Sequence, residues 1–332
     1  MLGTIGVFVL CLSLTLGASD VLVRGLDSLG TRLTLSDGLL GLLTALGADA
    51  PEISSAVAAI RAGKPDVGLG VVLGSNLFNL AALLGVSALL AGHVRVHREG
   101  LLLDGGVGGA AAVLVAFMLL GGPVAPLMVV LVVLVGAYVV ALGVSPRVLA
   151  GLPLPHDLAQ GLAMAVSEVD RESGADPRVS TSKGSWALVV LLPAALAVII
   201  GGSIGLVNTA LVLASGLGVS PRLVGLVVLA GLTSLPNAYA ASRLALGGRG
   251  VAVVSETMNS NTINLLVGVG APALLFGVPA VTAETTTTLL WLLALTGLSL
   301  VLLGRREGLT RRGGSVVVLL YLAFVALQVS RG

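Results

Sequence analysis

The sequence predicts an all-α integral membrane protein with ten transmembrane helices, built as two five-helix repeats inserted in opposite orientations. Three observations predict this fold. The 332 residues are 56% hydrophobic and only 10% charged, a composition that a water-soluble domain would not carry without aggregating. Apolar stretches of about 20 residues recur along nearly the whole chain. A motif of polar and helix-breaking residues occurs twice, 185 residues apart.

Each apolar stretch is long enough to cross the hydrocarbon core of a bilayer as a helix, which satisfies its own backbone polar groups. No basic residue precedes the first stretch, so we interpret it as a retained helix rather than a secretory signal. It contains Cys11, the only cysteine, which excludes an intramolecular disulfide. The expected helices are 2–22, 38–60, 67–91, 100–120, 124–144, 185–216, 222–246, 250–276, 285–303 and 314–329.

The basic residues predict the orientation of these helices, because loops rich in Lys and Arg stay in the cytoplasm. Fourteen of the 18 basic residues fall in one set of loops, so we expect a multi-pass protein of the cell membrane with both termini outside. This bias also explains the net charge of +2 without a nucleic-acid partner. The cytoplasmic set is Arg24, Arg32, Arg95, Arg98, Arg147, Arg171, Arg178, Lys183, Arg243, Arg249, Arg305, Arg306, Arg311 and Arg312.

The repeated motif aligns without a gap over two segments of the chain. Five predicted helices separate its two copies, and an odd number inverts the second copy relative to the first. We therefore divide the chain into a first repeat at 1–144, a cytoplasmic linker at 145–184 and a second repeat at 185–332. The aligned positions are Ala48 to Glu52 with Thr233 to Asn237, Gly63 with Gly248, Gly74 to Asn76 with Asn259 to Asn261, Asn79 with Asn264, and Gly85 with Gly270.

Both copies share one physical plan. A proline, Pro51 or Pro236, is expected to break a helix at membrane depth and to free backbone carbonyls that can bind cations. The helix that follows presents a serine and an asparagine at i and i+4, hence on one face. These pairs are Ser75 with Asn79 and Ser260 with Asn264.

The acidic residues beside the motif indicate which ion these carbonyl, serine and asparagine groups could bind. Glu52 follows Pro51, Asp49 lies three residues earlier, and Glu256 lies one turn before Ser260. Carboxylates inside a membrane are costly and are functional candidates by default. Oxygen ligands with two or three negative charges suit hard cations such as Ca²⁺ or Na⁺ rather than Zn²⁺ or copper. The expected partners are thus small inorganic cations and the lipid bilayer, with no cofactor.

The two copies of this motif resemble the alpha repeats of the cation/calcium exchanger family, which includes the sodium/calcium exchangers. The resemblance implies a ten-helix antiporter whose ion sites use the Glu after Pro, the Thr-Ser before it, and the Ser and Asn of the Gly-Ser-Asn segment. Together with the acids beside these positions, the expected cation ligands are Asp49, Glu52, Ser75, Asn79, Thr233, Ser234, Asn237, Glu256, Ser260 and Asn264.

The sequence departs from the family pattern at ligand positions. Asn237 replaces the second Glu, and Ala48-Asp49 replaces Thr-Ser, so either Asp49 or Glu256 could supply the missing charge. Sodium/calcium exchange by alternating access is the expected function. Exchange of a cation against protons is the alternative, because buried carboxylates also bind protons, and a member that no longer transports is a third. No catalytic constellation or ATP-binding motif is present, so we do not expect the protein to be an enzyme. We expect it to be a monomer.

Overall fold

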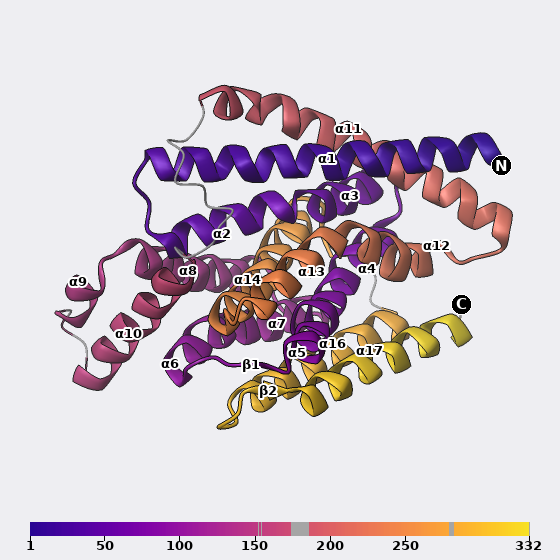
Figure 1. The fold of residues 1–332 in the computed structure, drawn as a ribbon. Helices are drawn as coiled ribbons and strands as arrows, with labels where there is room; N and C mark the ends of the chain where they lie inside the picture. The colour runs from indigo at the N-terminus through magenta and orange to yellow at the C-terminus, as the bar shows by residue number, and fades with distance from the viewer. Residues whose placement is uncertain (152, 154, 174–185, 279–281, 332) are drawn as a thin grey trace.

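The computed structural model describes residues 1–332 except 152, 154, 174–185, 279–281 and 332. It is almost wholly helical (Figure 1). In chain order the helices are α1 (Leu2–Arg32), α2 (Asp37–Ala48), α3 (Ala50–Arg61), α4 (Pro65–Asn79), η1 (Leu80–Val86), α5 (Ser87–Ala91), α6 (Arg98–Gly100), η2 (Leu101–Gly105), α7 (Gly106–Leu119), α8 (Val124–Gly143), α9 (Pro146–Ala150), α10 (His156–Ser173), α11 (Trp186–Leu217), α12 (Pro221–Leu223), η3 (Val224–Leu229), α13 (Ala230–Leu246), α14 (Gly250–Ile263), η4 (Asn264–Gly270), α15 (Ala271–Phe276), α16 (Ala283–Leu303) and α17 (Arg311–Arg331), where η marks a π-helical segment.

Eight helices within the described residues are long and apolar enough to cross a membrane. They match eight of the ten predicted stretches. Seven agree with the predicted ends to within three residues, whereas the first, predicted at 2–22, continues to Gly30. The predicted stretch 38–60 is divided between α2 and α3, which are each only 12 residues long. The predicted stretch 250–276 is continuously helical through α14, η4 and α15, but polar residues between Ser255 and Asn264 lower its hydropathy.

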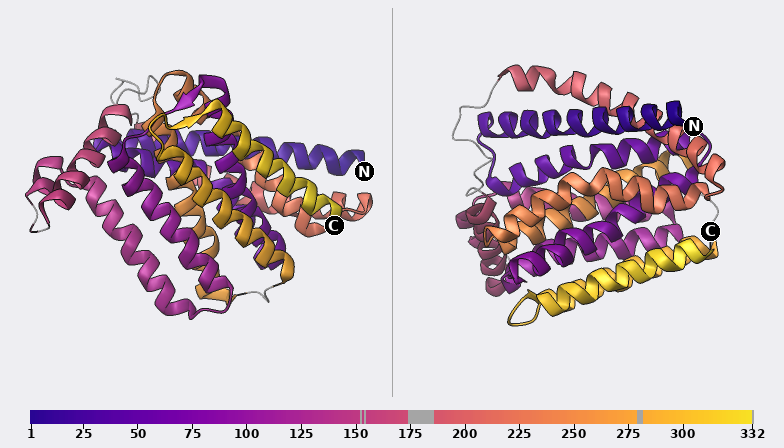
Figure 2. Two further views of the ribbon diagram at one scale, coloured as in Figure 1. Left: turned by 90° about the horizontal axis from the view of Figure 1, so that it is seen from below. Right: turned by 45° about the vertical axis from the view of Figure 1, so that its right-hand side comes forward.

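The helices form an inner and an outer layer (Figure 2). The run from α4 through η1 to α5 is the innermost, with 94% of its most apolar window buried. In α1, α8 and α17 the corresponding share is only 22%, and α11 is exposed to a similar degree. Because these exposed surfaces are apolar, they are suited to contact lipid. The polar groups of the repeated motif belong to the inner layer.

Glycines allow the inner helices to approach closely. A Cβ atom added to Gly74 of α4 would collide with the carbonyl oxygen of Leu226 in η3. A Cβ added to Gly225 would lie 2.6 Å from the carbonyl oxygen of Val67. Small residues at such crossings let two backbones pack within van der Waals distance, as is common in membrane proteins. This crossing joins the two halves of the chain at the level of the repeated motif.

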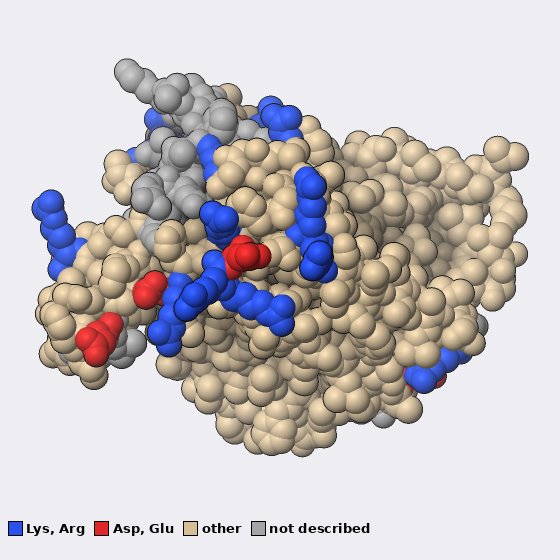
Figure 3. Space-filling model, turned by 60° about the horizontal axis from the view of Figure 1, so that its bottom comes forward, with Lys and Arg blue, Asp and Glu red and all other residues tan. Residues whose placement is uncertain are grey.

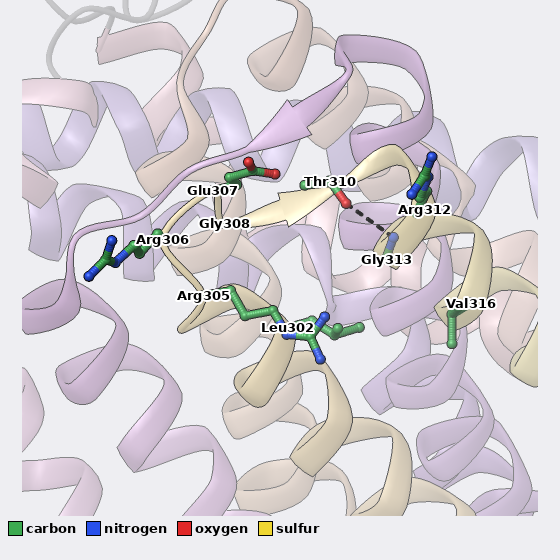
Figure 4. Close-up of a pocket in the computed structure, with 9 residues that line it drawn as sticks. All are labelled: Leu302, Arg305, Arg306, Glu307, Gly308, Thr310, Arg312, Gly313 and Val316. Atoms are coloured by element: carbon green, nitrogen blue, oxygen red, sulfur yellow. Dashed lines mark hydrogen bonds between the residues drawn. The ribbon is translucent and has the colours of Figure 1, made fainter.

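The two ends of the helical bundle differ in charge. Both termini lie at one end, and the opposite end contains the short strands β1 (His93–Val94) and β2 (Leu309–Thr310), which pair antiparallel (Figures 1 and 2). Basic side chains gather on the face shown in Figure 3. A cavity of about 420 Å³ opens beside β2 and is lined by Arg305, Arg306 and Arg312 among others (Figure 4). This cavity contains none of the predicted cation ligands.

The segment between the two halves contains α9 and α10. The longer of the two, α10, runs from His156 to Ser173 within the predicted linker. It packs against α2, α6 and α14, at the end of the bundle opposite the termini (Figure 1). The rest of the predicted linker, 174–185, lies outside the described residues.

Candidate cation-binding site

The first copy of the motif is a broken helix, as predicted. α2 ends at Ala48, α3 begins at Ala50, and Asp49 between them serves as the cap of both helices. Pro51 occupies the first turn of α3, where its missing N–H breaks no helical hydrogen bond. The hydroxyl of Ser19 in α1 donates to the carbonyl of Gly47 at 3.0 Å. The break therefore places Asp49 and Glu52 at the junction of two short helices.

The second copy is not broken, so this part of the prediction is wrong. α13 continues as a helix from Ala230 to Leu246 with Pro236 inside it. The helix continues although Pro236 removes its own N–H from the helical hydrogen-bond pattern. One turn earlier, the Thr233 hydroxyl donates to the Leu229 carbonyl at 2.8 Å. The π-helical segment η3 lies immediately before α13 and widens the helix there.

The two copies of the motif are joined by a pair of hydrogen bonds. Ser234 Oγ donates to Glu52 Oε1 at 2.8 Å, and Asn237 Nδ2 donates to Asp49 Oδ1 at 2.9 Å. The alignment of the repeats relates Asp49 to Ser234 and Glu52 to Asn237, so each of the two bonds is the repeat equivalent of the other. All four side chains are buried.

A second set of hydrogen bonds joins α4 to α14. Asn79 Nδ2 donates to Ser260 Oγ at 2.9 Å and to Asn261 Oδ1 at 3.1 Å. Ser260 Oγ donates in turn to Asp49 Oδ1 at 2.6 Å. The amides of Asn76 and Asn261 each donate to the backbone carbonyl of the other at 3.2 Å, and these residues are also repeat equivalents, 185 positions apart.

Several buried polar atoms of this cluster have no hydrogen-bond partner. Burying an acceptor without a partner costs about 1–3 kcal/mol, so such atoms call for a functional reason. A cation bound among them would supply the missing interaction to the oxygen atoms, and oxygen ligands are those that Ca²⁺ and Na⁺ prefer. The atoms are Asp49 Oδ2, Glu52 Oε2, Ser75 Oγ, Asn76 Oδ1, Asn79 Oδ1, Asn264 Oδ1 and Asn264 Nδ2.

The remaining predicted residues differ in how they relate to this cluster. Ser75 and Asn264 are wholly buried on the two helices that carry Asn79 and Ser260. Thr233 is buried next to Ser234, with its hydroxyl bonded to its own helix. Glu256 is only half-buried on α14, whereas Asp49 is wholly buried and accepts hydrogen bonds from Ser260 and Asn237. Asp49 is thus the better placed of the two acids that could replace the missing Glu.

The cluster contains two carboxylates and otherwise neutral groups. Within the described residues, no three His, Cys, Asp or Glu side chains gather closely enough to hold a metal ion. The π-helical segments η1 and η4 begin directly after Asn79 and at Asn264, respectively. Such segments often lie at functional sites, and here they occur at equivalent positions of the two repeats.

One buried acid, Asp104, is not among the residues predicted from the sequence. Asp104 lies in η2 and hydrogen-bonds with the hydroxyl of Tyr138 at 2.9 Å. Tyr138 also contacts Asn259, which precedes Ser260 on α14. The available signal was an acidic residue inside the apolar stretch 100–120, which is costly in a membrane.

Comparisons with known proteins assign the chain to a family. The sequence model described as "Sodium/calcium exchanger protein" matches residues 3–146 and 187–330. CaxA of Alkalimonas amylolytica is 39% identical over 84 residues, which cover 25% of this chain and 26% of CaxA. Sodium/potassium/calcium exchanger 3 of Homo sapiens is 35% identical over 98 residues, which cover 28% of this chain and 15% of that protein. The matched segments therefore span about a quarter or less of these curated relatives.

Solved structures share the fold. The H⁺/Ca²⁺ exchanger CAX superposes with a TM-score of 0.74 at 15% identity, covering 97% of this chain and 82% of that one. The sodium-calcium exchanger NCX_Mj superposes with a TM-score of 0.63 at 22% identity, covering 98% of both chains. The family and these structural neighbours are membrane exchangers and not enzymes. With most of its length matched by the family model, this chain belongs to the sodium/calcium exchanger protein family.

Proposed function

We propose that this protein is a secondary active antiporter that exchanges Ca²⁺ against Na⁺ by alternating access. One observation carries the proposal: Asp49 and Glu52 are wholly buried at a helix break, and each keeps one carboxylate oxygen without a hydrogen-bond partner. Two carboxylates held in this way inside a membrane protein are expensive unless a cation or a proton neutralises them. Family membership supports the same function.

The cation is proposed to bind on the side of the cluster formed by Glu52, Ser75 and Asn264. On this side the partner-free atoms include Ser75 Oγ and Asn264 Oδ1, whereas their repeat equivalents Ser260 and Asn79 are bonded to each other. α3, which carries Glu52, packs against both α4 and η4, which carry Ser75 and Asn264. These groups and the free oxygen of Asp49 would form an oxygen shell with a charge of up to −2.

Coupling would follow from charge. One Ca²⁺ neutralises two carboxylates, and so do two Na⁺ ions, so the two kinds of occupant exclude each other. A neutralised cavity lowers the cost of moving helices across it, whereas an empty, charged one resists that step. Alternating access with obligatory exchange is the expected result.

We further propose that the ten helical segments form two inverted repeats of five. The reciprocal bonds between Asn76 and Asn261 support this, as do the bonds that pair Asp49 with Asn237 and Glu52 with Ser234. The division at 1–144, 145–184 and 185–332 remains a prediction, in keeping with the two ranges that the family model matches.

The orientation is proposed from the charge of the two ends. Arg305, Arg306 and Arg312 line the cavity at the end that carries β1 and β2 (Figure 4). Loops rich in arginine remain in the cytoplasm. Both termini, which lie at the opposite end, would then face outward across the cell membrane (Figure 1).

Proton-driven exchange is the second candidate function. The free oxygens of Asp49 and Glu52 can accept a proton as well as a metal ion, and two protons would neutralise the pair as two Na⁺ ions do. The fold is shared with both a proton-coupled and a sodium-coupled exchanger, and so does not separate the two.

The test is Ca²⁺ uptake into proteoliposomes that contain the full chain. An outward Na⁺ gradient and an outward H⁺ gradient are imposed separately, with protein-free vesicles as the control. Uptake driven by Na⁺ supports the first proposal, and uptake driven only by H⁺ supports the second. Absence of Ca²⁺ flux under both gradients, with the protein correctly inserted, would contradict both and indicate a member that does not transport calcium.

A further inference from the structure

A second buried polar cluster lies between η2, α8 and α14 and shares no residue with the proposed cation site. The Tyr138 hydroxyl lies 2.9 Å from Asp104 Oδ1 and 2.7 Å from Asn259 Oδ1. Asn259 Nδ2 lies 3.2 Å from Ser255 Oγ. Asp104, Tyr138 and Asn259 are each at most 4% exposed. Because Asp104 lies within a membrane-crossing helix, its charge state matters for the whole cluster.

The protonation of Asp104 and the direction of the Tyr138 hydrogen bonds depend on each other. A tyrosine hydroxyl has a single proton to donate, yet two acceptor oxygens lie within hydrogen-bond distance of it. If Tyr138 donates to Asn259, the short contact with Asp104 is a hydrogen bond only when the carboxyl group carries its own proton and donates it to the Tyr138 oxygen. With Tyr138 donating to Asn259 and Asn259 Nδ2 donating to Ser255, all three hydrogen bonds can therefore form at once when Asp104 is protonated.

The same four side chains can also accommodate an ionised Asp104. Tyr138 then donates to the carboxylate. The amide of Asn259 turns over, so that its Nδ2 donates to the Tyr138 oxygen and its Oδ1 accepts from the Ser255 hydroxyl. Each hydrogen bond of the first arrangement has a counterpart in the second, and the change requires only an amide flip and hydroxyl rotations.

We propose that Asp104, Tyr138, Asn259 and Ser255 form a proton-binding site, in which Asp104 gains and loses a proton while the other three exchange donor and acceptor roles. The site lies six residues beyond Arg98, the first residue of α6, about 9 Å along the helix from its end. This is the end of the bundle that bears β1 and β2, and protons would enter from that side.

Other ionisable groups lie on the elements packed against η2. α6 contributes Arg98, which is exposed, and Glu99, which is half-buried. α14 contributes the half-buried Glu256. On α10 the described ionisable side chains are His156 and Asp157, both exposed, and on α16 the described one is Glu284, in its first turn. Tyr138 is the described ionisable group that is hydrogen-bonded to Asp104.

The site is positioned to influence cation binding through α14. Asn259, which changes its hydrogen-bond role, directly precedes Ser260, whose hydroxyl donates to Asp49. Protonation of Asp104 would thereby change the hydrogen bonds of Asn259, the residue next to Ser260 of the cation cluster. This inference does not depend on which ion drives exchange.

Infrared difference spectroscopy between acidic and alkaline buffer, on the full chain in lipid nanodiscs, tests the proposal. The wild-type protein should show a carbonyl stretching band of a protonated carboxylic acid that disappears at alkaline pH. This band should be lost in Asp104→Asn and shifted in frequency in Tyr138→Phe, which removes its hydrogen-bond partner. Glu99→Gln, the matched control at the start of α6, should retain it unchanged.

Two outcomes would overturn the proposal. One is a difference spectrum in Asp104→Asn that keeps every pH-dependent carbonyl band of the wild type. The other is an Asp104 band that persists without change across the pH range in which the protein stays folded. Tyr138→Phe keeps the carboxyl group, so its band shift provides a test even if Asp104→Asn fails to fold. With Ca²⁺ flux as a second readout, Asp104→Asn should have a flatter pH profile than Glu99→Gln.

Discussion

The two sides of the cation cluster are built from equivalent residues of the repeats but are bonded differently. On one side Asn79 donates to Ser260, and Ser260 donates to Asp49. On the other side the equivalents, Asn264 and Ser75, both have side-chain atoms without a partner. A sequence alignment treats the two sides as the same. We call the side of Asn79, Ser260 and Asp49 the closed side, because hydrogen bonds join its three residues, although Asn79 Oδ1 and Asp49 Oδ2 have no partner. We call the side of Asn264, Ser75 and Glu52 the open side, because no hydrogen bond joins Asn264 to Ser75.

One substitution explains the difference. Asp49 provides a carboxylate that accepts from both Ser260 and Asn237. At the equivalent position Ser234 has only a hydroxyl, and that hydroxyl is used as a donor to Glu52. Ser75 therefore lacks a charged acceptor, and Asn264 in turn lacks a serine held in place to receive its amide. The comparison indicates that Asp49 holds the hydrogen bonds of the closed side together. On the open side, the proposed cation would take the place of these hydrogen bonds.

The largest effect is expected from Glu52→Gln. This change keeps the shape of the side chain but removes the negative charge on the open side, so the cavity can no longer be neutralised by Ca²⁺. Exchange should fall to the level of protein-free vesicles while the protein still inserts and stays folded, as measured by Ca²⁺ flux and by size-exclusion chromatography. Exchange at the wild-type rate would show that Glu52 is not a ligand.

A charge swap tests whether Asp49 replaces the acid missing at Asn237. Asp49→Ser removes a charge and Asn237→Glu places a second carboxylate beside Asp49, so each single variant should lower exchange by about tenfold or more, which corresponds to about 1.4 kcal/mol. The double variant restores the total charge and recreates the serine–glutamate pair seen between Ser234 and Glu52. It should recover most of the activity. If the double variant is no better than the worse single one, the two positions are not equivalent.

The repeat-equivalent positions Gly74 and Asn259 provide a comparison outside the cluster. Gly74 lets α4 touch η3, whereas Asn259 joins the Tyr138 cluster. In Gly74→Ala the new Cβ would collide with the Leu226 carbonyl, and overpacking of this kind costs about 1–3 kcal/mol. The midpoint of thermal unfolding in detergent should fall. Gly136→Ala on α8, where a Cβ meets no atom within 4 Å, is the control and should be neutral or slightly stabilising. Equal midpoints for the two variants would refute the close crossing.

The helices were largely predictable because an apolar run of fixed length is a local property of the sequence. The break next to Pro51 was also predicted, and it lies at Asp49, two residues before that proline. The continuity of α13 through Pro236 was not, because a proline inside a helix can be tolerated when the packing around it favours a continuous helix. The hydrogen-bond partners within the cluster join residues about 180 positions apart, such as Glu52 and Ser234, and only packing determines them. Asp104 lies outside the repeated motif, so the repeat comparison could not reveal it.

The smallest expected effect separates the roles of Asn79 and Asn264, which the alignment makes equivalent. Asn79→Ala removes two hydrogen bonds and should lower the free energy of unfolding by about 1 kcal/mol, a value typical of polar contacts between membrane helices. Asn264→Ala removes no hydrogen bond of this structure, so stability should change little. Its Ca²⁺ affinity should instead weaken by about tenfold, because an oxygen of the open side is lost. Thermal unfolding and equilibrium Ca²⁺ binding measured on both variants give the comparison. If both substitutions reduced stability and affinity to the same extent, the closed and open sides would be one symmetric site, and the assignment of the cation to Glu52, Ser75 and Asn264 would fail.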